Sequence, residues 1–257
     1  MNIGVIGGHG FVGSGVCAAL EAEKHDVRAI SRENYDEMTG MHFDAIVNAN
    51  GNSKKYLAEQ DPQLDYEMSV ESVSRSLADF RFETYVFISS GDVYSEADTG
   101  ILCSETDEAV DRSLSHYGRN KRAAEDLVKS GSGRHLILRP SGFVGNGLKK
   151  NPIFDLLAGK GLWIHPDCRM QFINTVSFGQ VMATLLKKGA EGLFNVTGKG
   201  HISPREVASE FDLPLTAGTD EKPLLEYNLN LQKVGQYFEL PSTRDEVFSF
   251  IQTWRSE

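Results

Sequence analysis

Three side chains in the first half of the sequence could together move a proton to or from a substrate oxygen. Tyr117 and Lys121 lie four residues apart in a helical pattern, so they share one helix face about one turn apart. A phenol with an ordinary pKa of about 10 is a poor base at neutral pH, and a nearby ammonium lowers that pKa. Ser90 follows an apolar strand and could hold the substrate oxygen in line with the phenol. Tyr117 could then act as general acid or base, although each of these signals alone is common by chance.

A glycine-rich turn near the start of the chain has the pattern of a dinucleotide site. A short apolar run of strand type precedes Gly7, Gly10 and Gly13, and a helical pattern follows them. Gly7 can adopt the backbone angles of a tight turn, Gly10 leaves room for a pyrophosphate, and Gly13 lets the helix lie close to the strand. The helix start at Phe11 and Val12 presents unpaired N–H groups to phosphates. We therefore expect dinucleotide binding here, with a purely structural turn as the alternative.

The end of the second strand bears on the choice of cofactor. Residues 26–30 read as this strand, which runs into Ser31 and Arg32 without a carboxylate at its tip. An acidic residue at this point usually binds the ribose hydroxyls of NAD, whereas an arginine accommodates the 2′-phosphate of NADP. The sequence thus favours NADP(H) over NAD(H). The alternative is that Arg32 is a surface charge stacked on the adenine.

The next strand follows after a short interval. The 13 residues from 31 to 43 can hold a turn of helix and little else, so we expect a truncated crossover and an edge strand that is missing or vestigial. Asn48, Ala49 and Asn50 stand at the carboxyl end of the strand that follows, where open α/β sheets bind ligands. Small residues there would let the ribose and phosphate of a cofactor approach the backbone.

Helical and strand patterns continue to alternate up to about residue 145. A helix is expected over 61–79, opened by Asp61 and Pro62, and a buried strand over 84–89. An acidic loop over 95–113 and a helix ending at Gly131 follow. Alternation of this kind predicts an α/β fold with a doubly wound parallel sheet of Rossmann type.

The last third of the chain is less regular and reads as a small C-terminal lid. Ser203 to Glu206 forms a strong helix start, with a serine cap, a proline and a glutamate that reaches back. We expect a dinucleotide-binding domain formed by residues 1–145 and about 174–198. The substrate-binding lid would comprise about 146–173 and 199–257.

Composition excludes several other classes of function. The formal net charge of −10 argues against nucleic acid as the main partner, because phosphate binding depends on clustered Lys and Arg. No apolar run reaches the length of a membrane span, and the chain enters its first strand at once, which leaves no room for a signal peptide. The three cysteines lack metal-ligand spacing and fit a reducing cytoplasm, with Cys17 expected in the core. We expect a cytoplasmic protein with no metal site.

Taken together, the motifs resemble the extended branch of the short-chain dehydrogenase/reductase superfamily, the NAD-dependent epimerases, dehydratases and reductases of nucleotide sugars. The resemblance rests on GGHGFVGS, VNANG, ISSGDVY, YGRNK and LRPSGFVG in that order, and it resumes at RMQFI. It implies a Rossmann domain with a lid, and catalysis by Tyr117, Lys121 and Ser90. It also implies that Lys121 binds the nicotinamide ribose and that Pro140 lies beside the nicotinamide. Family members often pair through helices corresponding to 61–79 and 114–130, which allows a homodimer.

Departures from the family pattern narrow what the resemblance implies. Gly91 and Asp92 stand where related dehydratases have Asp-Glu, so an elimination that needs both acids is not expected. Asp92 could serve as an acid or contact the substrate, and we favour a partner for the loop backbone. Arg169 resembles the arginine that pairs with the nucleotide diphosphate, a contact that suits a guanidinium.

The sequence therefore predicts an NAD(P)-dependent oxidoreductase or epimerase acting on a hydroxyl or keto carbon of a nucleotide sugar. One alternative is an NADPH-dependent reductase of a smaller carbonyl compound, which a short lid would accommodate. Another is a regulator that senses the dinucleotide without turnover, although such a protein has no need of all three catalytic side chains.

Overall fold

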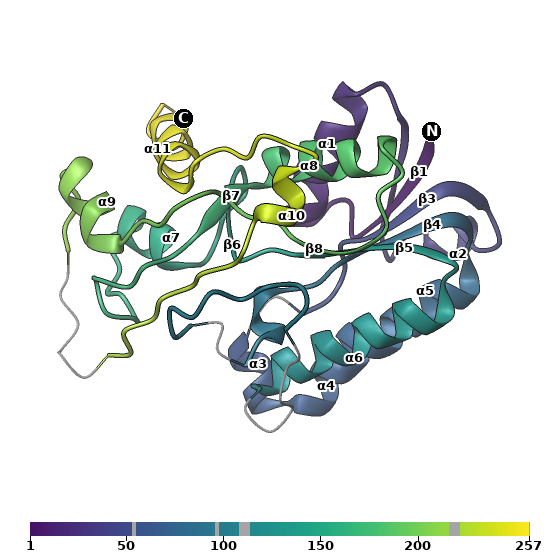
Figure 1. Cartoon of the computed structure of the whole chain (residues 1–257), viewed down its shortest axis with the longest axis horizontal. Coiled ribbons are helices and arrows are strands. Elements are labelled where there is room, and N and C mark those ends of the chain that lie inside the picture. The colour runs from purple at the N-terminus through teal and green to yellow at the C-terminus, as the bar shows by residue number, and fades with distance from the viewer. Residues whose placement is uncertain (53–54, 96–97, 108–113, 216–221, 257) are drawn as a thin grey trace.

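A twisted sheet of six parallel strands is the centre of the molecule (Figure 1). The computed structural model describes residues 1–257 apart from 53–54, 96–97, 108–113, 216–221 and 257. Within those residues the strands lie in the order β2 (Asp26–Ile30), β1 (Asn2–Ile6), β3 (His42–Asn48), β4 (Arg81–Ile88), β5 (Arg134–Arg139) and β8 (Gly192–Asn195). Every pairing between neighbours is parallel. The predicted doubly wound α/β fold is confirmed.

Helices cover both faces of this sheet. On one side lie α1 (Phe11–Ala22), α8 (Thr175–Lys187) and the short α10 (Gln232–Gly235) (Figure 1). On the other lie α3 (Lys55–Gln60), α4 (Pro62–Tyr66), α5 (Ser72–Asp79) and α6 (His116–Gly131). Gly179 brings α8 against α1, since a Cβ there would lie 2.6 Å from the Cβ of Ala19.

Two apolar clusters, one on each face, fill the space between sheet and helices. Successive side chains of a strand point to opposite faces, and Val5 joins the cluster beneath α1 and α8 while Ile6 joins the one beneath α5 and α6. A strand covered by helices on both faces needs apolar side chains on both faces, which explains the continuous apolar run in the second half of β4.

The crossover from β2 to β3 is truncated, as the sequence predicts. It holds only the four-residue helix α2 (Tyr35–Met38). In the described part of the chain β2 is the edge of the sheet, next to β1, and no strand lies beyond it.

The helical run from residue 62 to residue 79 begins where it was expected but is not uniform. The Asp61 side chain caps it by accepting from the Leu64 N–H at 3.0 Å. Between α4 and α5 the chain forms a π-helical turn, η1 (Glu67–Glu71), which the apolar pattern did not predict.

The C-terminal third surrounds a small two-stranded sheet, β6 (Gly142–Val144) paired in parallel with β7 (Phe172–Asn174). Helices α7 (Pro152–Leu157), α9 (Pro204–Glu210) and α11 (Thr243–Trp254) pack around an apolar cluster of their own there (Figure 1). The predicted capping box of Ser203 and Glu206 is present. Strand β6 was not predicted, and part of the expected acidic loop, 96–97 and 108–113, lies outside the described residues.

Candidate active site

The turn after β1 has the geometry that its glycines predict. Gly7 has a φ of +77°, in the left-handed region, and its N–H donates to the Ile30 carbonyl at the end of β2 at 2.8 Å. A Cβ on Gly13 would lie 2.1 Å from the Gly7 carbonyl oxygen, so only glycine allows α1 to approach the turn this closely. The start of α1 is thereby fixed at the carboxyl ends of β1 and β2.

The residues at this turn fit a dinucleotide's pyrophosphate. Gly10 is the N-cap of α1 and supplies no side-chain cap, so the N–H groups of the first turn, from Phe11 onward, are left for an external acceptor. Beside the turn, the Ser31 N–H donates to Asn34 Oδ1 at 2.7 Å, and Arg32 is exposed. The N–H groups at the start of α1 and the exposed Arg32 are suited to phosphate and ribose oxygens, whereas the Ser31 N–H is already taken by Asn34.

The three small residues at the end of β3, Asn48, Ala49 and Asn50, have different environments. The Asn48 side chain is fully buried and donates to the hydroxyls of Ser76 and Tyr85, while its Oδ1 accepts from the Asn50 N–H at 3.0 Å. Asn48 therefore shapes the loop through its side chain. The Ala49 backbone lies against Gly7, 3.2 Å from a Cβ built there, and Asn50 is exposed.

Ser90 and Tyr117 are brought together by the start of α6. The Ser115 hydroxyl caps this helix by accepting from the Gly118 N–H at 3.1 Å. Gly118 lets the helix touch the loop after β4, because a Cβ there would lie 2.4 Å from the Asp92 carbonyl oxygen. Both residues are buried, and the Ser90 hydroxyl is close enough to the Tyr117 phenol to act on its pKa, which it lowers.

Lys121 lies one turn further along α6, buried at the carboxyl end of β4. Its Nζ donates to the Ile88 carbonyl at 3.1 Å and lies 5.0 Å from the centre of the Phe87 ring. Burial lowers the pKa of the Lys121 ammonium to about 8, against the opposing pull of the Asp65 and Glu125 carboxylates.

We expected a nearby ammonium to lower the pKa of the Tyr117 phenol below its ordinary value. That expectation is wrong, because the net pKa of Tyr117 is raised. Burial raises the pKa of Tyr117 above its ordinary value, and the Asp92 carboxylate raises it further. The ammonium that acts in the opposite direction is that of Lys55, not that of Lys121. The Tyr117 phenol is thus protonated at neutral pH in this structure.

Two residues of this cluster, Lys55 and Tyr227, were missed from the sequence. Lys55 Nζ lies 2.8 Å from Asp92 Oδ1 and 3.3 Å from the Tyr227 hydroxyl. The second oxygen of Asp92 accepts from the Ser90 hydroxyl at 2.9 Å. The Asp92 carboxylate therefore binds two side chains and is not the loop-backbone partner that we favoured. Lys55 begins a short helix and Tyr227 lies in an irregular segment, so no periodic pattern marks either residue.

Pro140 is buried at the end of β5, and its carbonyl accepts from the Gly91 N–H at 2.7 Å. The residue before it, Arg139, forms a buried bidentate ion pair with Glu125 of α6, with N···O distances of 2.8 and 2.6 Å. These contacts hold the loop after β4 and helix α6 against β5, and thereby fix the positions of Ser90 and Tyr117, which those elements carry.

Arg169 belongs to the C-terminal part of the chain. Its side chain is 58% exposed, and its Nη1 lies 3.1 Å from Glu226 Oε1. The Arg169 carbonyl accepts from the Tyr227 N–H at 2.9 Å, which places Arg169 beside the segment that contacts Lys55. An anion binding to Arg169 would have to compete with Glu226.

The model of the NAD dependent epimerase/dehydratase family matches residues 3–155. The chain belongs to this family. The match confirms the resemblance to the extended short-chain dehydrogenases/reductases and assigns the chain to a family of NAD(P)-dependent enzymes that includes epimerases and reductases. A comparison with curated protein sequences gave no significant match.

Solved structures of similar fold extend over the whole chain. A dTDP-4-dehydrorhamnose reductase from Bacillus anthracis in complex with NADP is 16% identical, with a TM-score of 0.78 over 98% of this chain and 97% of that one. MoeE5 in complex with UDP-glucuronic acid and NAD is 20% identical, with a TM-score of 0.82 over 100% of both chains. A UDP-glucose 4-epimerase from Thermotoga maritima with UDP-glucose is 14% identical, with a TM-score of 0.79 over 100% of this chain and 99% of that one. Identities this low show that the fold is shared.

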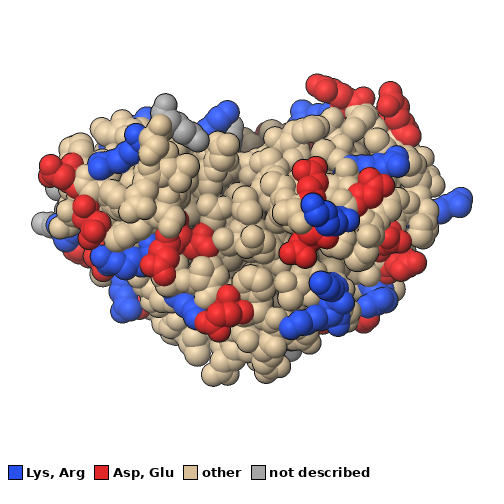
Figure 2. Space-filling model, turned by 90° about the horizontal axis from the view of Figure 1, so that it is seen from above, with Lys and Arg blue, Asp and Glu red and all other residues tan. Residues whose placement is uncertain are grey.

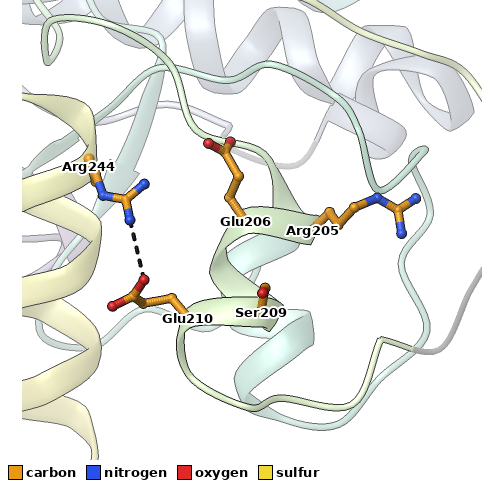
Figure 3. Close-up of a pocket in the computed structure, with 5 residues that line it drawn as sticks. All are labelled: Arg205, Glu206, Ser209, Glu210 and Arg244. Carbon is orange, nitrogen blue, oxygen red and sulfur yellow. Dashed lines mark hydrogen bonds and ion pairs between the residues drawn. The ribbon is translucent and has the colours of Figure 1, made fainter.

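A hollow between α9 and α11 is lined by Arg205, Glu206, Ser209, Glu210 and Arg244, and Arg244 pairs with Glu210 at 3.3 Å (Figure 3). Arg205 also pairs with Asp167, which lies outside this lining. Acidic and basic side chains are interspersed on the face shown in Figure 2. Among the described residues, no group of His, Cys, Asp and Glu could hold a metal ion, and no helix is long and apolar enough to span a membrane.

Proposed function

We propose that the protein is an NAD(P)-dependent oxidoreductase or epimerase that acts on a hydroxyl or keto carbon of a nucleotide sugar, with Tyr117 as general acid/base. The observation that carries this proposal is the position of the buried Tyr117 phenol beside Ser90, with Lys121 one turn away on the same helix. Membership of a family of NAD-dependent epimerases and dehydratases supports it.

Each of the three side chains has a definite role in the proposed reaction. The bound nicotinamide would supply or accept the hydride. The Tyr117 phenol is protonated at neutral pH, which suits it to give a proton to a carbonyl oxygen that is being reduced. Ser90 would hold that oxygen beside the phenol. Lys121, whose buried ammonium stays mainly protonated below a pKa of about 8, would bind the nicotinamide ribose.

The cofactor is proposed to bind along the carboxyl ends of β1, β2 and β3. The turn of Gly7, Gly10 and Gly13 would receive the pyrophosphate, and Ala49 and Asn50 would line the ribose. We propose a preference for NADP(H), because the exposed Arg32 is the second residue after β2 and no carboxylate stands at the tip of that strand. Pro140 would lie beside the nicotinamide.

The nucleotide sugar is proposed to bind between this site and the C-terminal part of the chain. Residues 1–145 and about 174–198 would form the dinucleotide-binding domain, and about 146–173 and 199–257 the lid. The separate apolar cluster around α7, α9 and α11 supports this division. Arg169 would exchange Glu226 for the nucleotide diphosphate, and Asp92 would face the sugar.

Two further properties belong to the proposal. Tyr56, Leu64 and Tyr66, on α3 and α4, are exposed by 58%, 37% and 40%, which supports a homodimer formed through the helices on that face of the sheet. Cys17, Cys103 and Cys168 are buried and form no disulfide, which supports a reducing, cytoplasmic location.

The test is a turnover assay with NADPH and NADH against a panel of 4-keto sugars and hydroxy sugars linked to dTDP and UDP, together with simple ketones. We expect loss of reduced cofactor, or epimerised product, with a nucleotide sugar. Tyr117→Phe should abolish turnover and leave cofactor affinity within about twofold, because it removes only the transferable proton. Turnover of simple ketones alone would favour the smaller-carbonyl reductase, and cofactor binding without any turnover would favour a sensor.

A further inference from the structure

A fully buried carboxylate, that of Asp65, joins the loop after β3 to helix α6. Asp65 lies on α4 and is 0% exposed. Its Oδ1 accepts from Asn52 Nδ2 at 2.8 Å, and its Oδ2 accepts from Asn120 Nδ2 at 2.7 Å. Ser69, in the π-helical turn η1, donates its hydroxyl to Oδ1 at 3.4 Å. Because these donors belong to the loop, to α6 and to η1, the carboxylate holds the three segments together.

The Lys121 ammonium lies against the same loop. A Cβ built on Gly51 would lie 3.5 Å from Lys121 Nζ and 3.8 Å from Ser69 Oγ, so both atoms face this glycine. Ser69 binds Asp65, and the residue that precedes Lys121 in α6 carries one of the amides that bind Asp65. The ammonium and the carboxylate therefore belong to one buried cluster.

The direct contacts of the two charged groups come from neutral partners. Asp65 accepts from two amides and a hydroxyl, and Lys121 donates to the Ile88 carbonyl at 3.1 Å. The Phe87 ring, 5.0 Å from Lys121 Nζ, is uncharged as well. A charge buried among neutral groups is costly unless an opposite charge lies nearby. The carboxylate and the ammonium reduce this cost for each other.

Two carboxylates act on the Lys121 ammonium, and they differ in their other partners. Burial lowers the pKa of Lys121 to about 8, and Asp65 opposes this more strongly than Glu125 does. Glu125, on α6, is already held by the bidentate ion pair with Arg139. Asp65 is thus the carboxylate whose charge is left for Lys121.

We propose that Asp65 is a positioning residue for Lys121, which it holds between α6 and the loop after β3 and keeps charged as a buried countercharge. This inference rests on the proposed binding of the nicotinamide ribose by Lys121. It assigns Asp65 to the position and charge of that lysine, without contact to cofactor or sugar.

The first measurement needs neither cofactor nor turnover. The ¹³Cε resonance of Lys121, assigned by its absence in Lys121→Met, is titrated with pH in the wild type and in Asp65→Asn. We expect the midpoint to fall by about one pH unit in Asp65→Asn, because the carboxylate that favours the charged form is gone. Asp61→Asn, at the exposed N-cap of the same helix, is the matched control and should leave the midpoint in place.

The second measurement is the affinity for NADP⁺ at two pH values. With the midpoint lowered from about 8 to about 7, about a quarter of Lys121 stays charged at pH 7.5, against about three quarters in the wild type. Asp65→Asn should therefore bind NADP⁺ about threefold more weakly at pH 7.5 and almost as tightly as the wild type at pH 6. In a Lys121→Met background, Asp65→Asn should cause no further loss, because the lysine through which it acts is gone.

Urea unfolding keeps the test decisive if Asp65→Asn folds poorly. The substitution retains the shape of the side chain and one acceptor oxygen. It should destabilise the wild type more than the Lys121→Met variant, in which no ammonium needs the countercharge. An equal loss of stability in both backgrounds would overturn the proposal.

Two other results would also overturn the positioning role. These are an unmoved Lys121 midpoint in Asp65→Asn, and a loss of NADP⁺ affinity that is the same at both pH values or persists in full in Lys121→Met. If the wild type binds no dinucleotide or turns over none of the sugars or ketones, the proposed function fails, and the Lys121 titration still decides whether Asp65 keeps the ammonium charged.

Discussion

At the scale of single residues, Lys121 combines a cost in stability with a role in the site. Its ammonium is buried, and the pKa falls from 10.5 to about 8, which corresponds to about 3 kcal/mol of unfavourable charge burial. Between these two pH values the unfolded chain binds more protons than the folded chain. The free energy of unfolding contributed by Lys121 therefore rises with pH over this window, and its unfavourable contribution is complete below about pH 8.

Lys121→Met should therefore stabilise the protein at neutral pH while damaging its function. We expect a gain of about 2 kcal/mol near pH 7, since the lost hydrogen bond to the Ile88 carbonyl offsets about 1 kcal/mol. The gain should vanish by about pH 10. Urea unfolding at both pH values measures it, with Lys199→Met as the exposed control. Cofactor affinity and kcat should both fall, and a variant that is less stable at neutral pH would contradict the cost assigned to the buried charge.

Arg32 carries the proposed choice of cofactor. Arg32→Ala should weaken NADPH binding by about tenfold and leave NADH within about twofold, because only NADPH has a phosphate for the guanidinium to bind. Arg81→Ala, at the exposed amino end of β4 and therefore at the opposite edge of the sheet, is the control. Titration of each variant with both cofactors measures the ratio. An equal loss of affinity for the two cofactors would show that Arg32 does not recognise the 2′-phosphate.

At the scale of elements, the start of α6 decides whether Tyr117 can reach Ser90. Gly118 is in contact with the Asp92 carbonyl oxygen, and its N–H is held by Ser115. The helix cannot be moved outward without withdrawing the phenol, since Tyr117 is the residue before Gly118 in α6.

Gly118→Ala should therefore impair both stability and activity. The added Cβ would stand 2.4 Å from a backbone oxygen, a clash expected to cost about 1–3 kcal/mol. Turnover should fall more than cofactor affinity does. Gly133→Ala is the matched control, because nothing lies within 4 Å of a Cβ there. Urea unfolding and kcat of the two variants separate these effects, and a fully active Gly118→Ala would show that α6 can shift without cost.

The sequence predicted the elements of the sheet better than the environment of the site. Apolar runs and glycines reflect the local conformation of the backbone. The turn after β1, the truncated crossover and the position of Tyr117 and Lys121 on one helix were therefore predicted correctly. The net pKa of Tyr117 depends on burial and on charges from other elements, and the prediction failed there. Lys55 meets Asp92, and Tyr227 meets Lys55, only through tertiary packing. Lys55 and Tyr227 are 172 residues apart in the sequence.

At the scale of the whole molecule, apolar side chains remain exposed on α3 and α4. Leu64 and Tyr66 both lie in α4, on the side of the sheet that α5 and α6 cover, and within the helical run through which the resembled family often pairs. Burying such side chains against a second copy would remove apolar surface from water.

We therefore expect the wild-type protein to sediment as a dimer at micromolar concentration and the double variant Leu64→Arg, Tyr66→Arg as a monomer. Two arginines placed on each copy would meet their own counterparts across a twofold interface, where like charges repel. Leu224→Arg is the control, since Leu224 is 66% exposed but belongs to the C-terminal part of the chain. Sedimentation velocity of the three proteins measures the state. A monomeric wild type, or a double variant that remains dimeric, would place these side chains outside any interface between copies.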